Sequence, residues 1–301
     1  MRTIYLDHNV AHYYVMGFPR DWNTYAEKAA LAKVLGSKAA VRISFSLWNI
    51  VESSREYPQN AEALGRFLDE QAPTWMHDRR VIQKAEVRNF VYSNVLGKAD
   101  KTSAVPVFAN NLSEIAHLLM PRELPRIGEN AQLLCKELTT VNDKAYSTLR
   151  EAEVAVPDAL RTLAKAKKEG KLTREIQQQT LLEWIGLSIP ERNPDGRPFR
   201  MEERSKLLDQ CVRRNGELLH ACPSMLAEDL MEGYRTEDTL RNPKASDAID
   251  LQHVVPALAY CDAIVTNDGY LKHHCERYSN EAKRNIVVAR SLSDAVSALS
   301  I

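Results

Sequence analysis

The chain has 301 residues, of which 44% are hydrophobic, and its 40 Lys and Arg residues balance 40 Asp and Glu residues. This length and apolar content suffice for a full hydrophobic core, so the composition argues against an intrinsically disordered protein. The net charge of zero excludes a protein that is basic over its whole surface. Any affinity for nucleic acid therefore has to come from local basic patches.

Cysteine usage and the absence of long apolar runs bear on the cellular compartment. The five cysteines are an odd number without a C-x-x-C pair, which is typical of free thiols in a reducing cytosol and argues against a structural zinc site. The N-terminus shows no export signal, and no run of about 18 apolar residues predicts a membrane span. We therefore expect a soluble cytoplasmic protein without a membrane partner.

Four short apolar or β-branched runs predict β-strands at residues 3–6, 41–45, 263–266 and 285–289. After the first strand, Asn23 or Thr24 can cap a helix that ends at Gly36. Strands that alternate with helices form parallel sheets. The sequence therefore predicts an α/β fold with a parallel, Rossmann-like sheet flanked by helices.

The middle of the chain has a different pattern, because apolar residues recur there at helical spacing and no convincing strand interrupts them. The helical stretches are residues 62–71, 112–119, 131–138, 207–219 and 224–234. Polar residues and prolines cluster at residues 98–106 and 241–245, where we place the boundaries. We predict a sheet domain from residues 1–100 plus 241–301 and a mostly α-helical insertion or cap at residues 101–240.

Acidic residues follow the predicted strands. Asp7 comes directly after the first strand, Glu52 lies in the helix expected after the second, and Asp268 follows the third. Because ligands bind at the carboxyl ends of the strands in open α/β sheets, we expect these carboxylates to converge. Each also has a simpler explanation on its own: a helix cap for Asp7, a solvated helix surface for Glu52, and a turn residue for Asp268.

A further group of polar residues precedes the third strand. Asp247, Asp250 and His253 are spaced three apart, so their side chains share one face of a helix. The helix dipole would favour both acids in a first turn, and His253 fits either a phosphate or metal-water contact or a packed position between helix and sheet. Pro256 is expected to break or kink this helix unless it lies near an end.

Together these acids resemble those of the PIN-domain nucleases. In that family an Asp-x-Asn-Val motif follows the first strand, a Glu lies on the helix after the second, an Asp opens a helix, and another Asp follows Val-Thr-x. Residues 7–10 read Asp-His-Asn-Val, and residues 265–268 read Val-Thr-Asn-Asp. The third and fourth acids are 18 residues apart (268 minus 250), close to the interval expected in the family. The resemblance covers the two ends of the chain, and the large helical insertion departs from the common form.

The resemblance implies a metal-dependent nuclease site with Mg²⁺ or Mn²⁺ as the cofactor, which agrees with the preference of these ions for hard oxygen ligands. The implied catalytic, metal-binding acids are Asp7, Glu52, Asp250 and Asp268, with Asp247 as a rival for the third place. Supporting positions are Asn9, His253 and Thr266.

The implied function is that of an endoribonuclease, which hydrolyses RNA phosphodiester bonds with a metal-activated water. PIN-type ribonucleases of this kind occur in toxin-antitoxin and RNA-processing settings. Two alternatives remain: a DNA nuclease that uses the same site on flaps or nicks, and a non-catalytic PIN-like scaffold that binds RNA or protein.

A basic stretch within the predicted insertion suits a phosphate backbone. Residues 161–174 hold six basic residues and a single acid, Glu169. Charge runs are more often solvated faces, so both interpretations stay open. The candidate nucleic-acid-binding residues are Lys165, Lys167, Lys168, Lys171 and Arg174. Candidate partners are RNA, DNA as the alternative, a second copy of the chain, and an inhibitor or antitoxin protein.

Overall fold

The structure is a computed structural model that describes residues 1–37, 39–71, 74–116, 130–140, 166, 169–170, 174–238 and 245–301. Within these ranges the side chains of residues 116, 137, 140, 174–178, 180, 236 and 245–249 are left out of the description. The chain divides into two compact units. Unit 1 comprises Met1–Asp78, Phe108–Ala159 and Ala245–Ile301, and unit 2 comprises Arg79–Val107 and Leu160–Lys244.

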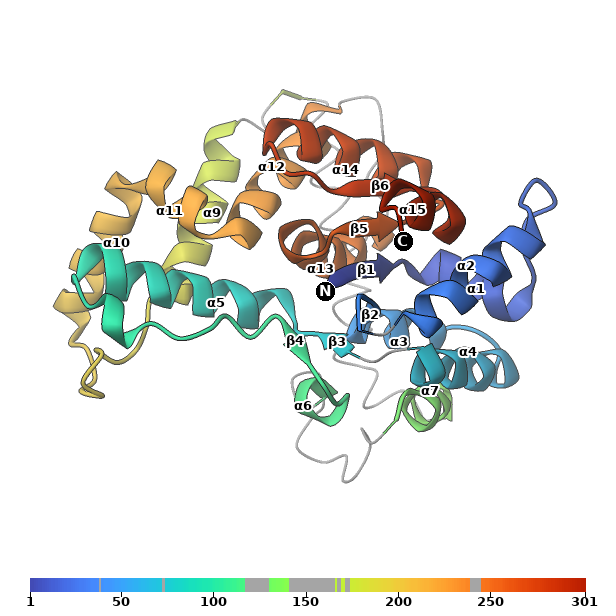
Figure 1. Ribbon diagram of the computed structural model, residues 1–301. Helices are drawn as coiled ribbons and strands as arrows, with labels where there is room; N and C mark the ends of the chain where they lie inside the picture. The colour runs from blue at the N-terminus through green and yellow to red at the C-terminus, as the bar shows by residue number, and fades with distance from the viewer. Residues whose placement is uncertain are drawn as a thin grey trace. The chain divides into compact units, whose positions relative to one another are not determined.

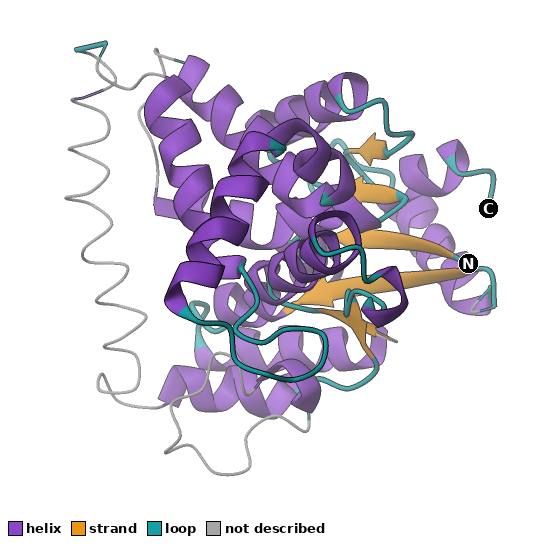
Figure 2. Cartoon of the chain, turned by 90° about the vertical axis from the view of Figure 1, so that its left-hand side faces the viewer, coloured by secondary structure: helices purple, strands orange, loops and turns teal. Residues whose placement is uncertain are grey.

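Unit 1 is built on a six-stranded sheet in the order β4-β3-β2-β1-β5-β6, whose strands lie side by side in Figure 2. All neighbouring strands are parallel except β3 and β4, which are antiparallel. The strands are β1 (Arg2–Leu6), β2 (Val41–Ser46), β3 (Thr74–Met76), β4 (Phe108–Ala109), β5 (Ala263–Val265) and β6 (Val287–Ala289). The fold is therefore α/β, as predicted.

The four strands predicted from the sequence are confirmed as β1, β2, β5 and β6. The expectation that no strand interrupts the middle of the chain is wrong, because β3 and β4 both join the sheet. They are three and two residues long. Such short segments show no alternation that periodicity could detect.

Helices flank this sheet (Figure 1). Those of unit 1 are α1 (His8–Met16), α2 (Thr24–Gly36), α3 (Leu47–Ser53), α4 (Pro58–Gln71), α6 (Ser113–Ala116), α7 (Ala131–Thr140), α13 (Ala245–Tyr260), α14 (Gly269–Glu281) and α15 (Leu292–Ala298). The side chain of Asn23 caps α2 by accepting from the backbone N–H of Ala26, and the helix ends at Gly36 as predicted. The central strands supply fully buried apolar side chains to the core, including those of Ile4, Leu6 and Phe45.

The order of the strands determines where a ligand can bind. From β1 the chain moves to β2 and β3 on one side, and it later returns to β5 and β6 on the other side. Ligands of open α/β sheets bind at such a reversal, outside the carboxyl ends of the strands. The carboxyl ends of β1 and β5 are therefore the expected place for a site.

Helix α13 continues through Pro256 and ends at Tyr260. The proline lies about one turn before the helix end, so the helix continues past it, as we expect for a proline near a helix end. The helix packs against β5, α3 and α14, so its inner face reaches the edge of the sheet where β1 and β5 end.

The close packing of α4 against α7 explains why α7 belongs to unit 1. A Cβ at Gly65 would lie 2.6 Å from the Cα of Gln132, so only glycine lets the two backbones approach this closely. Asp69 accepts hydrogen bonds from the backbone N–H groups of Ala131 and Gln132 and caps α7 from α4. Residues 79–100, which we placed in the sheet domain, belong to unit 2, and β4, α6 and α7, which we placed in the helical insertion, belong to unit 1.

Unit 2 is helical in its described part, in agreement with the predicted mostly α-helical region. Its helices are α5 (Arg79–Phe90), η1 (Val91–Val95), η2 (Ala99–Lys101), α9 (Arg174–Ser188), α10 (Met201–Arg213), α11 (Asn215–Ala221) and α12 (Pro223–Glu237). The stretch 207–219 is interrupted at Arg214, between α10 and α11. Buried Arg79 pairs with Glu228 at 2.7 Å, which satisfies both charges inside the helical core.

The five cysteines are free thiols, and all five are buried. Among the described residues, every helix is too short or too polar to serve as a membrane span.

Candidate metal centre

Asp7 lies where β1 ends and α1 begins, and it is buried. Its Oδ1 accepts from the backbone N–H of His8 at 2.8 Å, and its Oδ2 accepts from the hydroxyl of Thr266 at 2.7 Å. The helix-capping role considered for Asp7 is therefore compatible with a site role. A carboxylate has about four acceptor positions, so these hydrogen bonds leave a lone pair for a cation.

Glu52 lies on α3, which follows β2 directly. Its Oε2 is buried and has no hydrogen-bond partner in the part of the chain that the structure describes. Burial raises the pKa of this carboxyl well above its usual value, and the negative charges of Asp7 and Asp250 raise it further. Glu52 thus presents one buried carboxyl oxygen that accepts no hydrogen bond from a described residue.

His253 lies on the inner face of α13, and its side chain is fully buried. Its Nδ1 is 2.8 Å from the hydroxyl of Tyr5, and the two rings are stacked. Within the described residues its Nε2 has no hydrogen-bond partner. Burial, followed by the charge of His8, lowers the pKa of His253 to about 3, so the ring is neutral at physiological pH.

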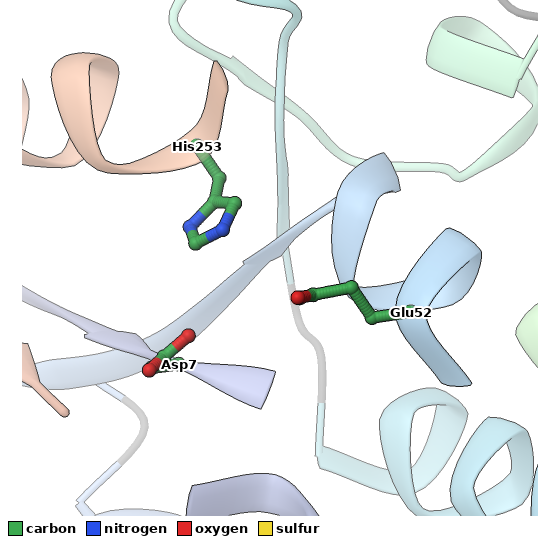
Figure 3. Close-up of side chains that lie close together, drawn as sticks. All are labelled: Asp7, Glu52 and His253. Atoms are coloured by element: carbon green, nitrogen blue, oxygen red, sulfur yellow. The ribbon is translucent and has the colours of Figure 1, made fainter. Parts of the chain in front are cut away.

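These three side chains converge. Asp7, Glu52 and His253 each offer one ligand atom, and the three atoms lie within 4.8 Å of one another. Figure 3 shows the three side chains extending from β1, α3 and α13 toward a common space. Two carboxylates and one neutral imidazole form a donor set that fits a divalent cation.

Asp250 and Asp268 border this group. One helical turn before His253, Asp250 places its Oδ1 3.9 Å from the histidine Nε2. Asp268 caps α14, and its Oδ1 accepts from the backbone N–H groups of Tyr270 and Leu271. Its negative charge contributes to the raised pKa of Asp7, which places it close to the same centre.

The supporting positions Thr266 and Asn9 both contact Asp7. Thr266 follows β5, is fully buried, and donates its hydroxyl proton to Asp7. It also accepts from the backbone N–H of Asp268 at 3.2 Å, so one hydroxyl links the two acids. The Asn9 side chain donates a hydrogen bond that lowers the pKa of Asp7. Thr266 and Asn9 therefore hold the carboxylate of Asp7 in place.

The electrostatics of the centre favour a cation. Burial raises the pKa of Asp7 to about 6, in spite of the hydrogen bonds from Thr266 and His8 that lower it. Two neighbouring carboxylates with raised pKa values, those of Asp7 and Glu52, repel each other when both are ionised. A divalent cation between them would remove this repulsion, so the donor set and its charge fit the implied cofactor.

Two predictions lie outside the described residues. The side chain of Asp247 is not described, so its rivalry with Asp250 stays a prediction. The same holds for the basic stretch, because neither Lys165, Lys167, Lys168 and Lys171 nor the side chain of Arg174 is described.

Sequence reasoning missed three polar residues beneath the centre, Tyr5, Ser46 and Asn49, which are buried in β1, at the end of β2 and in α3. Ser46 and Asn49 form a capping box at the start of α3. This S-x-x-N spacing is a signal that the sequence does contain. Tyr5 has no such signal, because a tyrosine in an apolar strand is indistinguishable from a core residue.

Comparison of the chain with protein-family models, curated proteins and solved structures finds no match. The likeness to PIN-domain nucleases therefore stays a prediction from the sequence motifs.

Proposed function

We propose that this chain is a metal-dependent endoribonuclease of PIN-like type, which hydrolyses RNA phosphodiester bonds. The observation that carries the proposal is the convergence of Asp7, Glu52 and His253 within 4.8 Å at the carboxyl edge of a parallel sheet. Ligand sites of α/β sheets lie at this edge. RNA as the substrate rests on the resemblance of the acidic motifs to those of PIN-type ribonucleases.

Asp7, Glu52 and His253 would hold Mg²⁺ or Mn²⁺, with Asp250 and Asp268 beside them. When bound, such an ion stabilises negative charge on phosphate oxygens and lowers the pKa of a water. The chain's own contribution is to orient the ligands. Thr266 and the His8 backbone N–H hold the two oxygens of Asp7, which keeps the carboxylate from rotating.

The test is cleavage of a fluorescent single-stranded RNA by the purified full chain with Mg²⁺ or Mn²⁺, next to a DNA of the same sequence. We expect RNA cleavage that EDTA, Asp7→Asn and Glu52→Gln each reduce by at least about 100-fold, as is typical when a group that organises a metal site is lost.

The matched control is Glu56→Gln, because Glu56 lies one turn after Glu52, is about one-third exposed, and pairs with His12 at 3.7 Å. Its cleavage rate should stay within about twofold of the wild type, since exposed ion pairs contribute little. Undiminished cleavage by Asp7→Asn and Glu52→Gln would overturn the assignment of the site. Cleavage of DNA alone would replace the substrate, and no cleavage of either would favour a binding scaffold.

A further inference from the structure

We propose that the Nε2 of His253 is a direct metal ligand, and that the centre consequently binds a transition-metal dication such as Mn²⁺ in preference to Mg²⁺. This inference rests on the proposed function because it concerns the same centre. It is a statement about metal binding, so it can be tested without a cleavage assay. It replaces the all-carboxylate ligand set expected from the sequence with two carboxylates and an imidazole.

Two backbone groups determine the orientation of the Asn49 side-chain amide. Asn49 Nδ2 donates to the carbonyl oxygen of Leu6 at 3.3 Å, and Asn49 Oδ1 accepts from the backbone N–H of Ser46 at 2.7 Å. A backbone carbonyl only accepts and a backbone N–H only donates. The reversed amide would face both groups with the wrong atom, so Oδ1 points toward Ser46 and Tyr5.

The orientation of Asn49 determines which neighbour the Tyr5 hydroxyl proton faces. The Tyr5 hydroxyl donates to Asn49 Oδ1 at 3.1 Å. A tyrosine hydroxyl keeps its proton at neutral pH, because its ordinary pKa is about 10. Because that single proton is directed at Asn49, the Tyr5 oxygen can only accept from its other polar neighbours, Ser46 and His253, and His253 Nδ1 lies 2.8 Å from it.

The contact with the Tyr5 hydroxyl determines the tautomer of His253. Nδ1 donates to Tyr5 and carries the proton, and a neutral imidazole then has a lone pair on Nε2. That nitrogen is buried and has no hydrogen-bond partner among the described residues, and His253 is one of the three residues whose ligand atoms converge with those of Asp7 and Glu52. A lone pair that faces carboxylate oxygens is repulsive unless a cation lies between them.

A proton on Nε2 or on a carboxyl group could also relieve this repulsion, because either would allow a hydrogen bond between the ring and a carboxyl oxygen. Asp250 Oδ1 lies 3.9 Å from Nε2, however, and neither Nε2 nor Glu52 Oε2 has a hydrogen-bond partner among the described residues. The arrangement instead matches metal-binding histidines, which donate their second ring N–H to a fixed acceptor. Here the fixed acceptor is the Tyr5 hydroxyl.

The metal preference follows from the donor set. Mg²⁺ prefers oxygen ligands and is dehydrated reluctantly, whereas imidazole nitrogen suits transition metals. A buried, neutral imidazole with its proton on Nδ1 offers the lone pair of Nε2 as a ligand. We expect Mn²⁺ to bind this nitrogen more tightly than Mg²⁺ does. We therefore expect Mn²⁺ to bind at least about tenfold more tightly than Mg²⁺.

The experiment measures metal binding by the full chain after EDTA treatment and dialysis. Mn²⁺ and Mg²⁺ affinities are measured by calorimetry, and pulsed electron paramagnetic resonance of bound Mn²⁺ detects modulation from a directly bound imidazole nitrogen. We expect this nitrogen modulation in the wild type and in His273→Gln, a control on α14 whose histidine is exposed. We expect its loss in His253→Gln, together with a fall of about tenfold or more in the ratio of Mn²⁺ to Mg²⁺ affinity.

Tyr5→Phe removes the hydroxyl that links Asn49 to His253. It keeps the proposed ligand and the ring that stacks on His253. It should lower Mn²⁺ affinity by about tenfold while the nitrogen modulation persists, as is typical when a partner of a ligand is lost. The wild-type spectrum decides the matter even if a variant does not fold. Bound Mn²⁺ without nitrogen modulation, or equal affinity for Mg²⁺ and Mn²⁺, would overturn the inference.

The two proposals fail separately. Nitrogen modulation in a protein that cleaves neither RNA nor DNA would contradict the proposed function and support the metal ligand. Mg²⁺-dependent RNA cleavage without nitrogen modulation would support the function and overturn the metal ligand.

Discussion

At the scale of single residues, Asp7 shows how one side chain serves both structure and site. Its carboxylate caps α1 through the His8 backbone N–H and also faces Glu52 and His253. Burial of this carboxyl group raises its pKa to about 6. The metal-free protein therefore holds a carboxylate that disfavours ionisation, and this has a cost in stability.

We predict that the metal-free protein loses stability as the pH rises from about 4 to above 6. Below the unfolded value of 3.8 both states hold the Asp7 proton, and above about 6 the folded state must carry a buried charge. The folded state binds more protons within this window, so the free energy of unfolding falls as the pH rises. The loss is on the order of 1–3 kcal/mol. Thermal unfolding in EDTA at a series of pH values measures it.

Asp7→Asn should flatten this pH dependence, because an amide does not titrate. The control is Asp21→Asn, which removes the same charge from a side chain that is 59% exposed and pairs with Arg290 at the surface. Its pH profile should follow the wild type. An Asp7→Asn profile as steep as that of the wild type would contradict the prediction.

At the scale of the elements, the contact between α4 and α7 depends on Gly65. A Cβ at this position would also meet the backbone oxygen of Ala131 at 2.7 Å, and backbone atoms cannot rotate away as a side chain can. We predict that Gly65→Ala destabilises the protein by about 1–3 kcal/mol.

The matched control is Gly233→Ala within α12, where an added Cβ meets no atom within 4 Å. Alanine has the higher helix propensity, so this variant should gain up to about 1 kcal/mol. Urea unfolding of both variants measures the two effects. Equal changes in the two variants would show that helix propensity, rather than the close approach of α4 and α7, sets the effect at Gly65.

The cap that Asp69 provides to α7 gives a second prediction for this contact. Asp69→Ala removes the acceptor of the Ala131 and Gln132 backbone N–H groups, which are at 2.6 Å and 2.9 Å. Loss of a helix cap costs about 1 kcal/mol. Asp69→Asn keeps one acceptor oxygen and should cost less, and hydrogen exchange of the first turn of α7 reports the difference.

At the scale of the whole molecule, the candidate ligands all belong to unit 1. Ligand binding stabilises the structure that contains the site. We predict that Mn²⁺ at 100 times its dissociation constant slows hydrogen exchange about 100-fold in β1, α3 and α13, since this excess contributes about 2.7 kcal/mol. Exchange in α10 and α12 of unit 2 should not change, and an equal slowing in both units would contradict the prediction.

The sequence by itself determined the local elements and the places of the acids along them. Strands β1, β2, β5 and β6 follow from short apolar runs, and the α2 limits follow from Asn23 and Gly36. Asp7 and Asp268 could be assigned to the carboxyl ends of strands. Asp7 directly follows an apolar run, and Asp268 is separated from one by two polar residues, Thr266 and Asn267. These features depend on neighbours in the chain, which a sequence displays.

Only the tertiary structure decided which side chains meet. Asp250 and His253 share one face of α13, so helical spacing alone could not choose between them. The packing of α13 against β5 and α3 places His253 in the group with Asp7 and Glu52 and leaves Asp250 at its border. The hydrogen bond between Tyr5 and Asn49 likewise joins residues that are 44 positions apart in the chain. Such contacts depend on how whole elements pack, and no local pattern records that.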